Sequence, residues 1–201
     1  MEIDPSSALV VEVYQALVDL VAPRPIAWVT TIDAQGRVNL APFSFFNTFG
    51  ANPPIVVFSP TLRRDGSRKD TLRNLESVGE FVVSAAVASL AREVNLTAKE
   101  LPSGENEAEL AGLQLVPSVK VRPPRVGLSP AHLECRVRQI ISCGDGPIAA
   151  NLVIGEVVLI HIDDHVLDPT GRVDPRALQS IARLGRDFFC RTTDLFEMER
   201  P

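Results

Sequence analysis

The sequence has few cysteines and no long apolar run, and these two absences exclude several classes of protein. Its three cysteines, Cys135, Cys143 and Cys190, include no Cys-x-x-Cys pair, so neither a disulfide framework nor a cysteine-rich zinc site is expected. No apolar run approaches the roughly 18 residues of a membrane span. The acidic residues Glu2 and Asp4 stand where a signal peptide would carry basic ones. We therefore expect a cytoplasmic protein with reduced thiols and no membrane partner.

Basic residues are scarce relative to acidic ones. The chain carries 20 Lys and Arg residues against 25 Asp and Glu residues, which gives a formal net charge of −5. A protein that binds nucleic acid normally shows a basic excess or a basic stripe, so no nucleic-acid partner is expected and any basic cluster must act locally. The glycine-rich motifs of dinucleotide-binding and phosphate-loop folds are absent too, which disfavours a doubly wound sheet.

The histidines give little basis for a metal site. The stretch HIDDH, from His161 to His165, is expected to be extended, so its two histidines would lie roughly 13 Å apart. That separation is too large for two ligands of one ion. His132 is isolated in the sequence, and we therefore expect no metal site.

The remaining composition is that of an ordinary globular protein. At 201 residues, with 45% hydrophobic and 22% charged residues, the chain is long enough for one sizeable core. It contains no internal repeat, no low-complexity linker and no change of composition along its length. We expect one domain over residues 1–201.

Short apolar runs bounded by turn residues dominate the chain and predict β-strands. Residues 26–49 read as a hairpin, in which the turn Asp-Ala-Gln-Gly separates two strands. Further strands are expected at 53–60, 79–87, 132–143 and 151–163, and helices within 7–21, at 69–77, at 88–101 and near the C-terminus. Strands joined mostly by turns predict a mainly β fold, a closed antiparallel barrel with peripheral helices.

One cationic segment suggests an anion site. In GSRKDTLRNLESVGEF (Gly66–Phe81), Arg68 and Lys69 come directly before Asp70 and Thr71, where a short helix is expected to begin. The N–H groups of a first helical turn, two basic side chains and a hydroxyl would suit a phosphate, whose oxygens accept several charge-assisted hydrogen bonds. The same residues would equally form a solvated basic face with Asp70 as a simple N-cap.

Aromatic and polar residues alternate in NLAPFSFFNTF (Asn39–Phe49), directly before a strand bounded by prolines. Flat apolar surface beside hydroxyl and amide groups would suit a planar heteroaromatic ring. A barrel core with polar residues in its turn explains the segment equally well. The hydroxyls of Thr30 and Thr31 are compatible with a plain strand and indicate nothing on their own.

Taken together, these segments resemble a known family. PRPIAWVTT, NLAPFSFFN, PPIVVFSP, RKDTLRNL and GEFVVS follow one another in this order, and the likeness continues downstream in HLECRV and LVIGEVVLIHIDD. They resemble the flavin reductase-like family of FMN-binding split barrels, over nearly the whole chain from Pro23 to Gly185. The resemblance implies a six-stranded antiparallel Greek-key split β-barrel with peripheral helices, which forms a homodimer and binds FMN near the subunit interface.

The resemblance also assigns residues to the cofactor. The phosphate and ribityl end would be held by Thr30, Thr31, Arg68, Lys69 and Thr71. The isoalloxazine would be lined by Ser44, Phe45, Phe46 and Asn47, with Ser59 and Pro60 closing the pocket.

The C-terminal segment ARLGRDFF would approach the flavin as well. The family often has a second glycine and a nearby tyrosine here, whereas this chain has Arg186 after Gly185 and two phenylalanines beyond. Arg186 is therefore expected either to narrow the pocket or to attract an anionic nicotinamide cofactor.

A flavin carries redox chemistry by itself, so no catalytic side chain is assigned. The leading hypothesis is an NAD(P)H-dependent flavin oxidoreductase, in which hydride passes from NADH or NADPH to the flavin and the electrons then go to an acceptor. One alternative is an FMN-loaded electron carrier of the flavoredoxin type, reduced by a protein partner. A second is a flavin-free binding module of the same fold, against which the retained RKDT and NLAPFSFFN segments speak.

Overall fold

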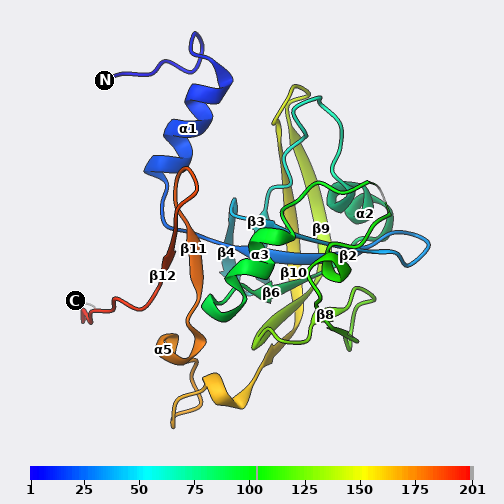
Figure 1. Ribbon diagram of the computed structural model, residues 1–201, viewed down its shortest axis with the longest axis vertical. Helices are drawn as coiled ribbons and strands as arrows, with labels where there is room; N and C mark the ends of the chain where they lie inside the picture. The colour runs from blue at the N-terminus through cyan, green and yellow to red at the C-terminus, as the bar shows by residue number, and fades with distance from the viewer. Residues whose placement is uncertain (103, 200–201) are drawn as a thin grey trace.

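A seven-stranded antiparallel sheet forms the centre of the structure (Figure 1). The computed structural model describes residues 1–102 and 104–199; residues 103, 200 and 201 of the expected domain lie outside this description. In order across the sheet, the strands are β3 (Val38–Phe43), β2 (Ala27–Ile32), β6 (Glu80–Ala85), β9 (Ala131–Cys143), β10 (Ala150–Ile162), β5 (Pro54–Phe58) and β4 (Phe46–Ala51). The fold of the described residues is therefore mainly β, as expected.

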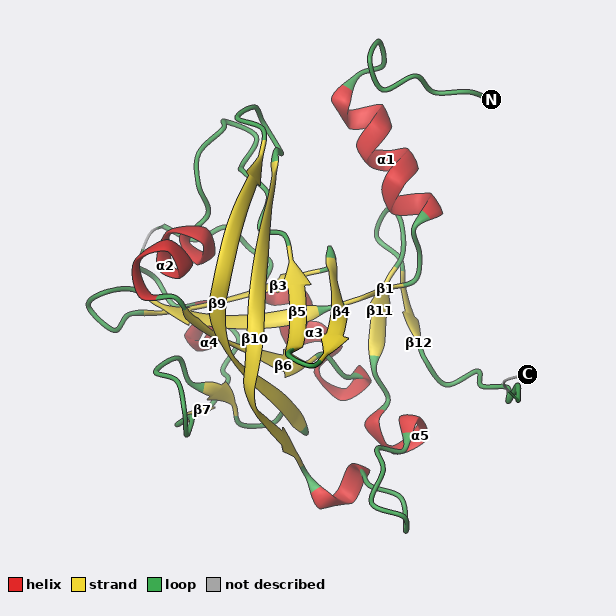
Figure 2. Ribbon diagram, turned by 180° about the vertical axis from the view of Figure 1, so that it is seen from behind, coloured by secondary structure: helices red, strands yellow, loops and turns green. Residues whose placement is uncertain are grey.

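Two small sheets and several short helices surround the large sheet. The small sheets are β1 (Arg24–Pro25), β11 (Ile181–Arg183) and β12 (Phe189–Arg191), and the pair β7 (Leu115–Val116) and β8 (Arg125–Val126). The helices are α1 (Val10–Leu20), α2 (Asp70–Val78), α3 (Ala91–Leu96), α4 (Glu107–Leu110) and α5 (Pro175–Leu178), with 3-10 turns η1 (Ala88–Leu90) and η2 (Asp164–Val166). Figure 2 shows α1 and the β1–β11–β12 sheet standing to one side of the large sheet, near both termini. No helix of the described residues is long and apolar enough to cross a membrane.

The closed barrel and the strand count of six are not confirmed. The return strand expected up to residue 49 is interrupted at Ser44 and Phe45, so that it forms β3 at one edge of the sheet and β4 at the other. In the described part of the chain no ladder joins β3 to β4, and a groove opens at the link between them. Strands β11 and β12 also replace part of the irregular C-terminal tail that we expected.

Two apolar cores lie on opposite faces of the sheet, and β2 contributes to both. All six of its residues are buried, because alternate side chains point to opposite covered faces. The core on one face, called the inner core, contains the rings of Phe43, Phe58 and Phe81. Their centroids lie 5.3 Å apart, both between Phe43 and Phe58 and between Phe58 and Phe81. The core on the opposite face, called the outer core, contains Trp28, whose indole Nε1 donates to Thr97 Oγ1 at 2.8 Å.

Polar side chains are also buried along β6, β9 and β10. Ser84 Oγ lies 3.0 Å from His132 Nδ1, and the fully buried Glu134 contacts His161 Nε2 at 2.7 Å and accepts the Val119 N–H at 2.8 Å. Burial, with a smaller contribution from nearby positive charge, lowers the pKa of His132 to about 4. His132 is thus neutral in the folded protein at neutral pH.

We predict that His132 makes the protein less stable in acid. Its folded pKa of about 4 lies below the unfolded value of about 6.5, so protonation favours the unfolded state as the pH falls through this interval. The free energy of unfolding should fall by at most about 1.4 kcal/mol per pH unit for one such group. His132→Gln should flatten this dependence in urea titrations between pH 7 and pH 4, whereas His165→Gln, at an exposed histidine, should not. An unchanged slope in His132→Gln would contradict the assignment.

Candidate functional site

A groove of about 710 Å³ opens beside the link between β3 and β4. Its walls are largely apolar and aromatic, and they include Tyr14 of α1, Pro42 and Phe43 of β3, Phe45 and Ile148. Ser44 and Ser59 add hydroxyl groups, and the charged end of the groove has three basic residues, Arg63, Arg64 and Lys69, and one acidic residue, Glu100. An apolar cleft with a few polar groups and a cationic end suits a planar ligand that carries an anionic group.

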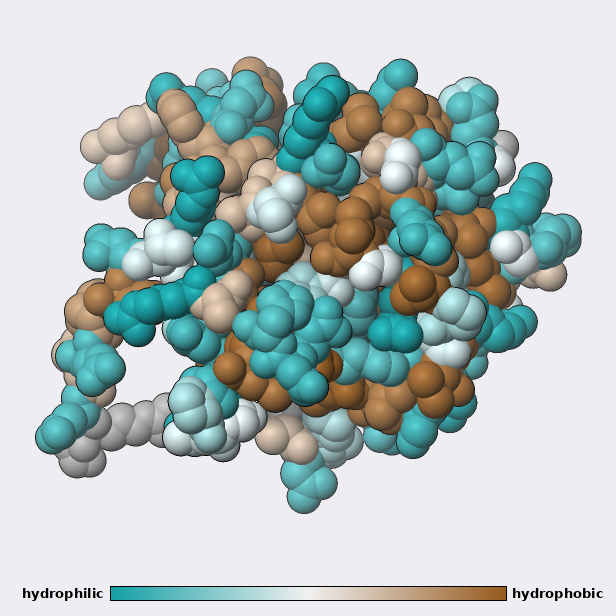
Figure 3. Space-filling view, turned by 60° about the horizontal axis from the view of Figure 1, so that its bottom comes forward, coloured by the Kyte–Doolittle hydropathy of each residue, from teal (hydrophilic) through white to brown (hydrophobic). Residues whose placement is uncertain are grey.

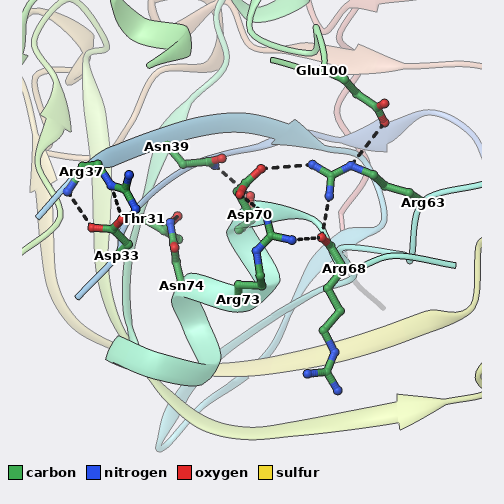
Figure 4. Close-up of polar contacts among 11 residues, drawn as sticks. Thr31, Asp33, Arg37, Asn39, Arg63, Arg68, Asp70, Arg73, Asn74 and Glu100 are labelled. Carbon is green, nitrogen blue, oxygen red and sulfur yellow. Dashed lines mark hydrogen bonds and ion pairs between the residues drawn. The ribbon is translucent and has the colours of Figure 1, made fainter. Parts of the chain in front are cut away.

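Lys69 is a half-buried cation in the lining of the groove. Its ammonium forms no hydrogen bond or ion pair with any residue in the described ranges, and it lies 5.7 Å from the centroid of the Phe43 ring. Burial lowers the pKa of Lys69, although the charge of Glu100 opposes this shift. Arg63, by contrast, is committed to Asp70 at 3.1 Å and approaches Glu100 at 3.9 Å (Figure 4). A half-buried ammonium without a partner favours an anionic ligand.

Two pairs of asparagine and threonine hold helix α2 against the sheet (Figure 4). Asn39 Nδ2 donates to Thr71 Oγ1 at 2.9 Å, and Asn74 Nδ2 donates to Thr31 Oγ1 at 3.0 Å. Thr30 Oγ1 is buried in β2 and has no hydrogen-bond partner among the described residues. The hydroxyls of Thr31 and Thr71 thus fix the start of α2, where Lys69 is the N-cap residue.

Thr71 also lines a smaller hollow of about 190 Å³, which shares Arg63 and Lys69 with the groove. Three carboxylates line this hollow as well, those of Asp70, Glu100 and Glu107. Burial raises the pKa of Glu107, whose carboxylate accepts the N–H of Leu40 at 2.9 Å. Three basic residues, Arg63, Lys69 and Lys99, balance these carboxylates, whereas the groove has three basic residues and the single carboxylate of Glu100. The groove therefore suits an anion better than this hollow does.

Arg68 does not line the groove. Its side chain is 60% exposed, pairs with Glu76 at 3.2 Å and points away from the Asp70 cluster in Figure 4. Only its backbone takes part in that cluster, because the Arg68 carbonyl accepts from Arg63 and from Arg73. Its assignment to the phosphate remains a prediction.

The residues expected around a planar ring divide into two groups. Ser44, Phe45 and Ser59 line the groove. Phe46 packs against the inner core, and Asn47 is exposed, with its Oδ1 accepting the N–H of Thr48. Pro60 is buried behind the groove, and its carbonyl accepts from Asn151 Nδ2 at 3.3 Å.

Arg186 lies in the exposed turn between β11 and β12 and does not line the groove. Its backbone has a positive φ of 53°, a left-handed conformation that costs a residue other than glycine about 1 kcal/mol. A glycine adopts this conformation without that cost, which gives a physical reason for the glycine that the flavin reductase-like family often has at this position.

Arg24 is a buried arginine that the sequence motifs did not single out. Its side chain is 6% exposed and donates to the carbonyls of Val18, Val21 and Leu184 and, at 3.4 Å, to Ser44 Oγ. Burial lowers the pKa of this guanidinium. Arg24 therefore joins the end of α1 and the β11–β12 turn to the wall of the groove.

Other groove residues were missed because their signals were weak. Tyr14, the single tyrosine of the chain, reaches the groove from α1 together with Val10 and Val11, at helical spacings of i, i+4 and i, i+3. Arg63 and Arg64 read as part of a solvated face. Among residues 1–102 and 104–199, no group of His, Cys, Asp and Glu is arranged to hold a metal ion.

One large antiparallel sheet with short helices around it matches the fold of the flavin reductase-like split-barrel proteins. The chain belongs to the flavin reductase-like family: the model of the flavin reductase like domain matches residues 21–180. A protein of Deinococcus radiodurans, itself uncharacterised, is 42% identical over 194 residues, covering 93% of this chain and 84% of its own.

Two solved structures are similar over almost their whole length. Nitrilotriacetate monooxygenase component B from Bacillus cereus is 36% identical, with a TM-score of 0.92 and 98% of both chains covered. Pseudomonas fluorescens 2-nitrobenzoate 2-nitroreductase is 32% identical, with a TM-score of 0.88, and the match covers 100% of this chain and 96% of that one.

We predict that Arg24→Gln destabilises the protein by about 2–4 kcal/mol, because several buried carbonyls lose a charged donor. Hydrogen exchange should show α1 losing protection while β9 and β10 keep theirs. Arg122→Gln is the matched control, since Arg122 is exposed and its pair with Glu80 should contribute at most about 1 kcal/mol. Equal effects of the two substitutions would show that Arg24 does not hold α1.

Proposed function

We propose that this protein is an FMN-binding oxidoreductase that accepts hydride from NADH or NADPH and passes the electrons to an acceptor. The observation that carries the proposal is the groove itself, in which aromatic walls lead to the unpaired ammonium of Lys69. Its membership of the flavin reductase-like family supports a flavin as the ligand. The names of the two similar enzymes, a monooxygenase component and a nitroreductase, support redox chemistry.

The lining residues fit FMN in size and in chemistry. A volume of about 710 Å³ lies in the usual range for a site that encloses a cofactor-sized molecule. Pro42, Phe43, Phe45 and Tyr14 offer flat apolar contacts to the ring. Lys69 would bind the phosphate, with Arg63 and Arg64 adding positive charge, and the placement suits FMN better than unphosphorylated riboflavin.

When bound, the flavin supplies the redox chemistry, so the protein needs to position it and exclude competing reactions. Ser44, Phe45 and Ser59 would orient the ring. Within this proposal, Thr31 and Thr71 would act through the position of α2, which places Lys69. The contact of Thr30, whose buried hydroxyl has no partner among the described residues, stays a prediction. No side chain of the groove is assigned a proton transfer.

The remaining predicted contacts do not line the groove of one chain. They are Phe46, Asn47, Pro60, Arg68 and Arg186. We propose that the exposed ones act on the site from a second copy of the chain, as a homodimer would allow.

The exposed apolar surface supports a homodimer. On α1, Val10, Leu17 and Leu20 are exposed, and so are Phe188 and Phe196 beyond β11. Figure 3 shows apolar side chains gathered in patches between polar ones on one face of the molecule. Light scattering of the FMN-loaded protein should give twice the mass of one chain.

A cytoplasmic location, where reduced nicotinamide nucleotides are available, belongs to the same proposal.

We expect the purified protein with added FMN to oxidise NADH or NADPH, measured as loss of absorbance of the reduced nucleotide. No turnover with either nucleotide while FMN stays bound would contradict the oxidoreductase proposal. Fast reduction by a low-potential protein donor under those conditions would instead favour the electron carrier. A protein that remains colourless and shows no thermal shift with FMN would favour the flavin-free module.

We predict that Lys69→Ala weakens FMN binding about 10- to 100-fold and riboflavin binding far less, because only FMN carries the phosphate. Flavin fluorescence titration measures both affinities. Arg92→Ala is the matched control, because it removes an exposed cation on α3 that does not line the groove. Equal losses for FMN and riboflavin in Lys69→Ala would mean that Lys69 supports the fold and does not bind phosphate.

A further inference from the structure

We propose that a second pocket, next to the groove, binds a small aromatic carboxylate through Arg183. The pocket has a volume of about 280 Å³ and lies where α1, α3 and the β11–β12 hairpin meet. These elements stand next to one another in Figure 1. The groove beside this pocket is the proposed flavin site, so the position of the ligand next to a flavin rests on the proposed function. Its binding to Arg183 does not.

Arg183 has the geometry of a carboxylate anchor. Its guanidinium lies 4.5 Å from the centroid of the Phe189 ring, so the ring fixes the orientation of the charged group. Nη2 donates to the carbonyl of Arg186, whereas Nε and Nη1 form no hydrogen bond with the described residues. Asp187 approaches at 3.8 Å but is fully exposed, so it neutralises the cation only weakly. Nη2 keeps a second N–H, so one edge of the stacked guanidinium can still donate two parallel hydrogen bonds to a carboxylate, from Nη2 together with Nε or Nη1.

The charge of the pocket also favours an anion. None of the described residues that line it is Asp or Glu. The buried guanidinium of Arg24 lies behind Ser44, close enough to Arg183 for mutual repulsion to lower the pKa of Arg24 further. The hollow that contains Thr71 is different, because three carboxylates and three basic side chains line it together.

The walls of the pocket specify the rest of the ligand. Ile26, Pro42, Val94 and Phe189 give apolar surface, and the volume is below the usual range for drug-sized ligands. A single aromatic ring fits these dimensions, while FMN or a dinucleotide does not. The pocket and the groove share Tyr14, Pro42 and Ser44, so a ring anchored on Arg183 would lie at the boundary with the groove.

The test compares benzoate with its neutral analogue benzamide. Calorimetry on the FMN-loaded protein should show benzoate binding at least 10-fold more tightly than benzamide, and benzoate should shift the flavin absorbance. Arg183→Met should remove the preference for benzoate, and Arg183→Lys, which keeps the charge but not the planar fork, should retain part of it. Arg191→Met, at an exposed arginine of the same hairpin, is the matched control and should behave like the unchanged protein.

The two proposals fail in different ways. If the protein binds no flavin, calorimetry of the flavin-free protein with benzoate and benzamide still tests the pocket. If flavin binds but benzoate binds no better than benzamide, or Arg183→Met keeps the preference, the pocket assignment is wrong while the flavin proposal stands. Circular dichroism of each variant shows whether a lost preference reflects a lost fold.

Discussion

The buried guanidinium of Arg24 is the constraint on which the arrangement around the groove depends. Burying a cation is unfavourable unless its donors are satisfied, and among the described residues Arg24 forms no ion pair. Its donors bind carbonyls at the end of α1, the carbonyl of Leu184 and the hydroxyl of Ser44. The end of a helix carries partial negative charge, so it can compensate a cation in place of a carboxylate. Glycine at position 185 completes this contact, because a Cβ there would overlap with Asp19. The aromatic wall that α1 contributes is therefore held by one polar side chain.

A second constraint acts at the other end of the groove, where α2 begins. The Asn39–Thr71 and Asn74–Thr31 hydrogen bonds are buried, and a buried polar pair is costly to break because each partner would be left unsatisfied. These bonds fix the start of the helix relative to β2 and β3, and they thereby fix the position of Lys69, the N-cap residue. Lys69, the proposed phosphate contact, and Thr71, which holds α2 in place, belong to the same short motif.

Local features of the fold were predictable from the sequence, and long-range ones were not. The hairpins β2–β3 and β9–β10 and the helix α2 follow from apolar patterns and turn residues within short windows. The separation of β3 from β4 depends on which distant strand each pairs with, and no local pattern encodes that choice. The same limit applies to the site. Motif order located the region, but Arg68 and Lys69 are neighbours whose side chains point in different directions, which only the packed helix decides. Tyr14 reaches the groove from α1, outside every motif, and Arg183 lies in the ARLGRDFF segment, where the sequence drew attention to Arg186 instead.

The open edges of the sheet have a further consequence. One wall of the groove belongs to β3, at one edge, and Ser59 follows β5, which pairs with the strand at the other edge. A molecule bound in the groove would contact both regions and would connect two edges of the sheet that no ladder joins in the described residues. Such binding would also stabilise the sheet, because a molecule that binds only the folded chain at free concentration L raises the free energy of unfolding by RT ln(1 + L/Kd). With FMN bound as proposed, the chain would be more stable than without it, and its sheet would be joined across both edges.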